Sequence, residues 1–120
     1  MKVRYVVLYV NDADVCRNFW VEQIGMVEKS RNDVAGISLV QVGFEDQEFA
    51  FELVPMSLMQ DNPDNLDLAT PSIAFRVDDL QASHDALAAA GVQVSDIAEH
   101  SGTPSFAFAD PEDHWFAVTE

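Results

Sequence analysis

The chain has 120 residues, of which 48% are hydrophobic and 22% charged, a composition typical of one globular domain and not of a disordered chain. Six basic and 21 acidic residues give a formal net charge of −15, which argues against binding to nucleic acid or anionic lipid. No apolar run is long enough to span a bilayer. Residues 1–6 show no signal-peptide pattern and Cys16 is the single cysteine, so we expect a cytoplasmic protein.

The first half of the chain carries the patterns of one helix and four strands. Asp12 and Asp14 follow an alternating first strand and can cap a helix that ends at Gly25. Hydrophobic residues recur at helical spacing within it, at Val15, Phe19, Trp20 and Ile24. The predicted strands are residues 3–10, 26–30, 37–42 and 48–54, with residues 31–33 breaking the second.

Residues 55–70 differ in character, because they combine Pro63 with several Asn and Asp residues. We interpret them as a linker with one short helical turn at residues 57–60. Met56, Leu58 and Met59 could instead cover the mouth of a pocket, since thioethers adapt to varied apolar partners. The plain linker is the favoured interpretation.

The second half repeats the order of the first. Asp78 and Asp79 cap a predicted helix that ends at Gly91, and the Asp110-Pro111 pair predicts a turn. The predicted strands are residues 73–77, 92–94, 105–109 and 115–118, with a loop at residues 99–104.

Two sequence shifts expose the repeat. A shift of 67 places residues 9–12 on residues 76–79, and a shift of 65 places residues 51–53 on residues 116–118. The repeat predicts one α+β domain made of two βαβββ modules, with one helix packed outside each module. We expect the modules to form a curved, partly closed mixed sheet around a cavity. The predicted parts are module one (1–54), the linker (55–70) and module two (71–120).

Five segments point to a known family. They are residues 5–12 (YVVLYVND), 19–25 (FWVEQIG), 72–79 (SIAFRVDD), 88–92 (AAAGV) and 110–118 (DPEDHWFAV). Their order and spacing resemble the vicinal oxygen chelate superfamily, which includes glyoxalase I, the bleomycin resistance proteins and the extradiol dioxygenases. The resemblance covers nearly the whole chain outside the linker and implies the same two-module fold. It implies no single activity, because this fold serves several.

The resemblance also places the metal ligands of the family's enzymes, one on each of four strands. The corresponding positions are Tyr5, Glu52, Ser72 and Ala117. Only Glu52 is a usual ligand, and a divalent ion needs several nitrogen or oxygen donors. We therefore expect no metal and no other cofactor, with Glu52 as the only retained residue of ligand type.

Strand alternation places candidate ligand-binding residues on the faces turned to the predicted cavity. Glu52 either binds a ligand cation, acts as a general base, or remains as an inherited carboxylate that is solvated or hydrogen-bonded to Tyr5 or Ser72. Arg76 either anchors an anionic group or, as we favour, pairs with an acid of the chain. The candidate set is Tyr5, Tyr9, Glu52, Ser72, Arg76 and Trp115, with Phe49 as a further source of apolar surface.

The three histidines fall outside the positions that the resemblance gives to metal ligands. His84 lies on the second predicted helix and His100 in a predicted loop. His114 follows the Asp-Pro pair, where it either shapes the turn or stacks on a ligand beside Trp115. Two further residues are assigned to packing, Trp20 and Cys16.

These inferences favour a metal-independent binding protein that encloses a small cationic or aromatic molecule, as the resemblance to the bleomycin resistance proteins implies. Aromatic side chains of the candidate set would supply stacking surface, and Glu52 would favour positive charge. The resemblance implies a homodimer. The alternative is a glyoxalase I-like, metal-dependent lyase or dioxygenase-type enzyme, with a metal held by Glu52 and a histidine such as His100 or His114.

Overall fold

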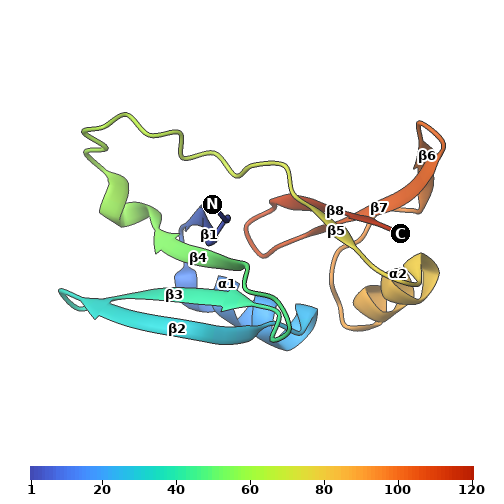
Figure 1. Cartoon of the computed structure of the whole chain (residues 1–120), viewed down its shortest axis with the longest axis horizontal. Coiled ribbons are helices and arrows are strands. Elements are labelled where there is room, and N and C mark those ends of the chain that lie inside the picture. Colours follow the sequence, from blue (N-terminus) through green and yellow to red (C-terminus); the bar gives the residue numbers. More distant parts are fainter. The chain divides into compact units, whose positions relative to one another are not determined.

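The computed structural model describes all residues, 1–120, and the chain divides into two compact units, residues 1–70 and residues 71–120. Each unit holds one four-stranded mixed sheet and one main helical segment (Figure 1). The prediction of two βαβββ modules in an α+β fold is confirmed. No helix combines the length and the apolar character that a membrane crossing requires.

Module one occupies the first unit together with the linker. Its elements are β1 (Tyr5–Val10), α1 (Ala13–Asn18), η1 (Phe19–Ile24), β2 (Val27–Val34), β3 (Ile37–Gly43) and β4 (Ala50–Pro55). The strands lie in the order β1-β4-β3-β2, with β1 parallel to β4 and the other neighbours antiparallel. Figure 1 shows β2 and β3 as a long hairpin beside β4.

The first helical segment begins and ends where the sequence predicts. The Asp12 side chain accepts a hydrogen bond from the Val15 amide at 3.1 Å, and Gly25 ends the segment in the left-handed region. The second half of the segment is the π-helix η1. Cys16 lies one turn before Trp20 and takes the buried position, whereas Val15 lies at the edge of the hydrophobic stripe and is 46% exposed.

The core of module one forms where this segment meets the sheet. Trp20 is fully buried and contacts Phe51 of β4 edge-on, with 5.1 Å between ring centroids. Phe49 contacts Phe51 in the same way at 5.6 Å. Phe49 therefore packs on the helix side of the sheet, which removes it from the candidate ligand surface.

Strand β2 differs from the prediction, because it continues through residues 31–33. Polar side chains are compatible with this strand, since β2 is at the edge of the sheet and most of its side chains are exposed. A register shift between Glu28 and Ser30 marks a bulge. Ala35 and Gly36 both have positive φ, as a two-residue hairpin turn requires.

The linker begins with η2 (Met56–Met59), a 3₁₀ helix that confirms the predicted short helical turn. Met56 and Met59 are half-buried next to the end of β4. Asn62 then closes a compact loop, because its side chain accepts from the Leu66 amide at 3.0 Å and donates to the Leu66 carbonyl at 2.9 Å. Part of the linker is thus held by its own hydrogen bonds.

Module two has the same order of elements as module one. They are β5 (Ala74–Arg76), α2 (Leu80–Ala89), β6 (Ala98–His100), β7 (Thr103–Ala109) and β8 (Trp115–Thr119). The strand order is β5-β8-β7-β6, with β5 parallel to β8 and the other neighbours antiparallel. On the helix side, Phe106, Phe108 and Phe116 are buried, and the last two stack at 5.6 Å.

Two predictions for module two are wrong. Residues 92–94 form no strand, although Val94 makes an isolated bridge to Phe108. The predicted loop at residues 99–104 is instead a hairpin, and His100 ends β6. Ser101 and Gly102 have positive φ and make its two-residue turn. They lie 66 positions after Ala35 and Gly36, so the repeat itself contains the signal for this hairpin.

The two modules also share strand register, which is stronger evidence of a repeat than the element order alone. β4 in module one and β8 in module two each pair with one parallel and one antiparallel strand. Adding 65 to 67 to the residue numbers of the module-one pairs gives the module-two pairs. The corresponding pairs are Val7–Glu52 and Ala74–Ala117, and Gln41–Glu52 and Ala107–Ala117. The curved sheet around a shared cavity stays a prediction.

Candidate functional site

The sheet of module one has one face covered by α1 and η1 and a second, helix-free face. On the covered face, alternate residues of β1, β3 and β4 are buried: Leu8, Val10, Val40, Val42, Phe51 and Leu53. The helix-free face carries the residues between them: Tyr5, Val7, Tyr9, Gln41, Glu52 and Val54. All of these are half-buried except Tyr5, which is 39% exposed.

Glu52 lies on β4 near the centre of the helix-free face. Directly opposite on β3, Gln41 donates a hydrogen bond from Nε2 to Glu52 Oε1 at 3.3 Å. The sequence predicted Tyr5 or Ser72 as the partner of an inherited carboxylate. The partner is Gln41 because the β3–β4 register places Gln41 directly opposite Glu52. Tyr5 belongs to β1, on the other edge of β4, and is opposite Ala50.

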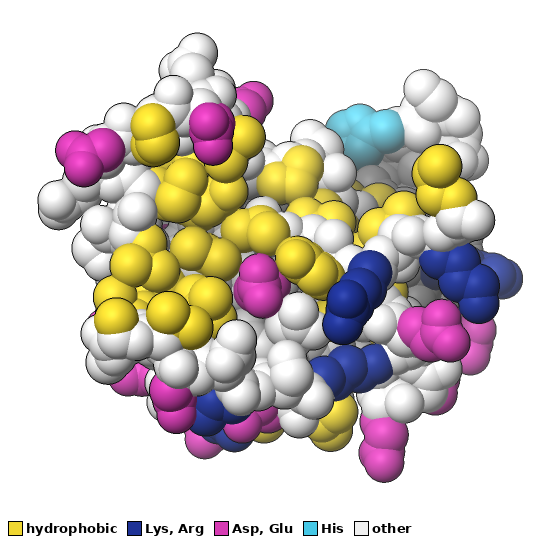
Figure 2. All heavy atoms as spheres, turned by 60° about the vertical axis from the view of Figure 1, so that its left-hand side comes forward, with side chains coloured by type: hydrophobic (Ala, Val, Ile, Leu, Met, Phe, Trp, Pro, Cys, Tyr) yellow, Lys and Arg dark blue, Asp and Glu magenta, His cyan; other side chains and the backbone are white.

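Aromatic and aliphatic side chains surround this polar pair. Val7 of β1 is directly opposite Glu52 of β4. Tyr5 and Tyr9 lie on the same face of β1, two residues before and two residues after Val7. Diagonal neighbours in a sheet are about 7–8 Å apart, which is within reach of an aromatic side chain. The face thus joins one carboxylate to two phenol rings. Figure 2 shows hydrophobic side chains gathered on one side of the chain, with few charged side chains among them.

The equivalent face of module two is almost free of polar groups at its centre. Ala74, Ala107 and Ala117 form one row across three strands, at the positions of Val7, Gln41 and Glu52. Trp115 precedes Ala117 on this face and is 46% exposed. The row offers a flat surface of small side chains beside one large aromatic ring.

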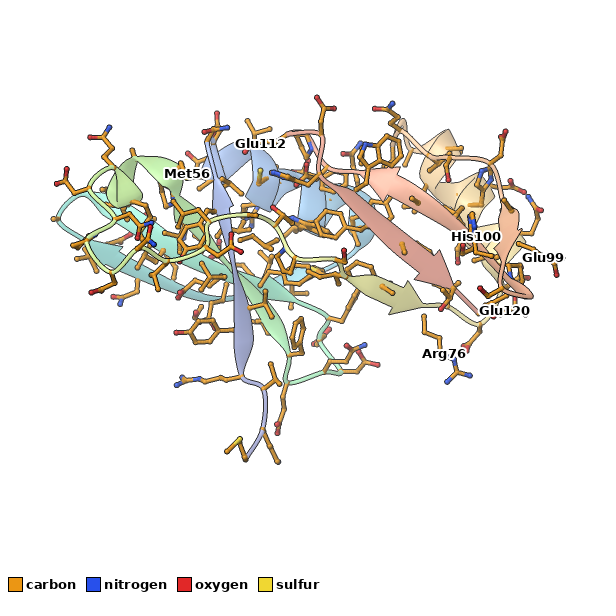
Figure 3. All side chains as sticks on the ribbon, turned by 90° about the horizontal axis from the view of Figure 1, so that it is seen from above. Met56, Arg76, Glu99, His100, Glu112 and Glu120 are labelled. Carbon is orange, nitrogen blue, oxygen red and sulfur yellow. The ribbon has the colours of Figure 1, made fainter.

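Two further candidates in module two are exposed. Ser72 lies before β5 and has no side-chain contact that would mark a site. Arg76 at the end of β5 extends away from the ribbon (Figure 3) and is exposed. No ion pair to Arg76 forms within module two, so the favoured interpretation of pairing with an acid of the chain finds no support there.

The residues at the family's metal-ligand positions do not fit a metal as a set. Ala117 has no donor atom, and only Glu52 among the four has a usual ligand side chain. No group of three or more His, Cys, Asp and Glu side chains comes together in a way that could hold an ion. We therefore derive no chemical step through a metal.

The hydrogen bonds in the turn between β7 and β8 show the structural role of His114. Asp110 is 5% exposed, and its Oδ1 accepts from the amides of Glu112 and His114, both at 2.9 Å. Its Oδ2 accepts from His114 Nδ1 at 3.0 Å. Of the two interpretations of His114, the shaping of the turn is therefore the one that the contacts support.

His84 has a structural role as well. Its Nε2 lies 3.0 Å from the Ser95 carbonyl oxygen, and its ring meets Phe106 edge-on at 5.1 Å. These contacts hold α2 against Ser95, in the segment before β6, and against Phe106 of β7. Its Nδ1 lies 3.1 Å from Asp85 Oδ1, and this hydrogen bond is the main reason that the pKa of Asp85 is lowered.

The other shifted groups lie on the edge of module one, away from the helix-free face. Arg31 and Arg17 both bond to the Glu28 carboxylate, at 2.7 and 3.3 Å. The hydrogen bond from Arg31 is the largest cause that lowers the pKa of Glu28, and the same bond raises the pKa of Arg31. This cluster connects the helical segment to β2.

A sequence profile of the Glyoxalase/Bleomycin resistance protein/Dioxygenase superfamily matches residues 2–118. The chain belongs to this superfamily. The match spans both modules and the linker, and it confirms the resemblance seen in the five sequence segments. A comparison with curated proteins finds no match.

Solved structures share the fold at low sequence identity. TnmS3, an antibiotic binding protein from Streptomyces sp. CB03234, is 19% identical with a TM-score of 0.80, over 99% of this chain and 94% of its own. A superfamily member from Sphaerobacter thermophilus is 20% identical with a TM-score of 0.80, over 100% and 97%. A glyoxalase family protein from Enterococcus faecalis is 16% identical with a TM-score of 0.75, over 99% and 97%.

Sequence reasoning found Glu52 but missed Gln41. Strand alternation would have placed Gln41 on the same face as Leu39 and apart from Val40 and Val42. What it could not supply is the register that sets Gln41 opposite Glu52. The available signal was a polar residue between two valines, Val40 and Val42, near the middle of the strand.

Proposed function

We propose that the helix-free face of module one binds a small aromatic cation without a metal ion. The observation that carries the proposal is Glu52, a half-buried carboxylate on a face that also bears Tyr5 and Tyr9. A carboxylate that is partly shielded from water attracts a cation more strongly than an exposed one. The net charge of −15 adds a long-range attraction for the same class of ligand.

The two kinds of contact supply affinity in different ways. The charge attraction between a cation and a partly shielded carboxylate about 4 Å apart is on the order of 1–4 kcal/mol. A cation over a tyrosine ring adds about 0.5–2 kcal/mol, depending on how far it is desolvated. Together they favour a cation joined to a flat ring over either group alone.

The comparisons support ligand binding in general terms. The superfamily includes bleomycin resistance proteins, and TnmS3 is an antibiotic binding protein. Binding without a metal rests on the donor set, since three of the four ligand positions are Tyr5, Ser72 and Ala117. A homodimer and a cytoplasmic location stay predictions.

The test compares two phenyl compounds of similar size, benzyltrimethylammonium and the neutral benzamide. Chemical-shift titration of the ¹⁵N-labelled chain should show tighter binding of the cation, with the largest shifts on β1, β3 and β4. Glu52→Gln should reduce cation affinity about tenfold, the equivalent of about 1.4 kcal/mol, and leave benzamide unchanged. EDTA should change neither result.

Two outcomes would contradict the proposal. Equal affinity for benzamide and the cation, or no binding of either, would remove the role of the carboxylate. Binding that EDTA abolishes and Zn²⁺, Ni²⁺ or Mn²⁺ restores would favour the metal-dependent alternative instead.

A further inference from the structure

We infer that Gln41 and Glu52 together select cations that carry two adjacent N–H donors, such as an amidinium or a guanidinium group, over quaternary ammonium groups. This inference rests on the proposed function and names the class of ligand for the same face. It depends on which atoms of the pair remain available once their mutual hydrogen bond has formed.

The chemistry of the pair decides the orientation of the Gln41 amide. An ionised carboxylate only accepts hydrogen bonds, so the amide atom 3.3 Å from Glu52 Oε1 must be the Nε2 donor. The Gln41 Oε1 atom is then an acceptor. Neither Gln41 nor Glu52 makes any other side-chain hydrogen bond within module one.

Two acceptors therefore remain on neighbouring strands, Oε2 of Glu52 and Oε1 of Gln41. Both side chains belong to residues that are directly opposite in the β3–β4 register, so the sheet places the two side chains side by side. A planar group with two parallel N–H bonds can donate to both, as amidinium and guanidinium groups do to paired oxygens. A quaternary ammonium ion has no N–H and can satisfy neither.

Gln41 also contributes to selectivity among cations, because its Oε1 atom is left without a donor when a ligand without N–H groups covers it. Both side chains are half-buried, and a ligand that covers them removes water from the two oxygens. A buried acceptor without a donor costs free energy, so a cation that lacks N–H groups should bind less tightly than a cation that carries them. Module two has no such pair, because the equivalent residues are Ala107 and Ala117.

The test adds benzamidine, protonated at neutral pH, to benzyltrimethylammonium and benzamide. Wild type should bind benzamidinium about fivefold to tenfold more tightly than benzyltrimethylammonium, because the quaternary ion makes neither of the two hydrogen bonds. Gln41→Met keeps the length of the side chain and removes both amide atoms. In this variant the bond to Gln41 Oε1 is lost and the bond to Glu52 Oε2 remains, so the ratio of the two cation affinities should fall but stay above one, while both cations still bind more tightly than benzamide.

The ratio within one protein sample cancels any general loss of stability in the variant, and the wild-type ratio tests the inference even if Gln41→Met does not fold. Equal affinity for the two cations in wild type, each above benzamide, would overturn this inference and leave the proposed function standing. An unchanged ratio in Gln41→Met would also overturn it. If benzamide binds as well as the cations, or if none binds, both conclusions fail.

Discussion

Gly43 provides a sharp test of how the two central strands approach each other. It is the last residue of β3, and a Cβ added there would lie 2.5 Å from the Phe49 carbonyl oxygen, 3.1 Å from Lys29 Cε and 3.3 Å from Ala50 Cα. The first distance is 0.5 Å below the 3.0 Å that real Cβ atoms keep from their neighbours. Gly43→Ala must therefore push β3 away from the start of β4.

The expected cost follows from two opposing terms. Forcing an extra methyl group into packed structure costs about 1–3 kcal/mol. Replacing glycine by alanine within a strand returns about 0.5–1 kcal/mol, because glycine loses more conformational freedom on folding. Gly43→Ala should therefore destabilise the fold by about 1–2 kcal/mol, since the nearest clashing atom belongs to the backbone and cannot rotate away.

Urea denaturation followed by tryptophan fluorescence measures this change. With a slope of about 2 kcal/mol/M, the midpoint should fall by about 0.5–1 M. Lys29→Ala, alone and combined with Gly43→Ala, tests the alternative that the flexible Lys29 side chain is the obstacle. Its Nζ donates to the Gln47 carbonyl, so the single variant measures the loss of that bond separately.

The result that would refute the reasoning is a midpoint for Gly43→Ala equal to or above that of wild type. Recovery of the loss in the double variant would place the clash on Lys29 and not on the Phe49 carbonyl. Because Gln41 and Ala50 are near neighbours of Gly43, we also expect Gly43→Ala to weaken binding of benzamidinium.

Two further predictions concern side chains outside the ligand face. Asp110→Ala should cost about 2–3 kcal/mol, because the half-buried amides of Glu112 and His114 lose the Asp110 carboxylate as their acceptor. His114→Ala should cost only about 1 kcal/mol, and similar midpoints for the two variants in urea would contradict this. Arg31 lowers the pKa of Glu28 below its ordinary value of 4.5, so this pair stabilises the fold above that pH and the effect is lost as the pH falls through the lowered pKa. Glu28→Gln should accordingly reduce the melting temperature more at pH 7 than at pH 3, and an equal reduction at both would show that charge is not the cause.

The linear pattern of residues was enough to predict the repeat, the helix caps and the covered faces of both sheets. These features are local, because a cap needs an Asp within one turn and an apolar face needs only alternation along one strand. Asp12 and Asp79 accept from the third residue of their helices at 3.1 and 3.0 Å, as the sequence predicts. The β6–β7 hairpin was missed because its Ser101-Gly102 turn is a weaker signal than an Asn-Gly pair.

Only the tertiary structure could bring Gln41 to Glu52. Eleven positions separate them, and their contact depends on the register of β3 against β4, in which a slip of one residue would turn Gln41 to the helix side. Register is decided by the packing of Val40, Val42 and Phe51 under the helix, which no single strand contains. The sequence alone therefore determined the family, the two modules and the carboxylate, and the folded sheet decided which side chain accompanies that carboxylate.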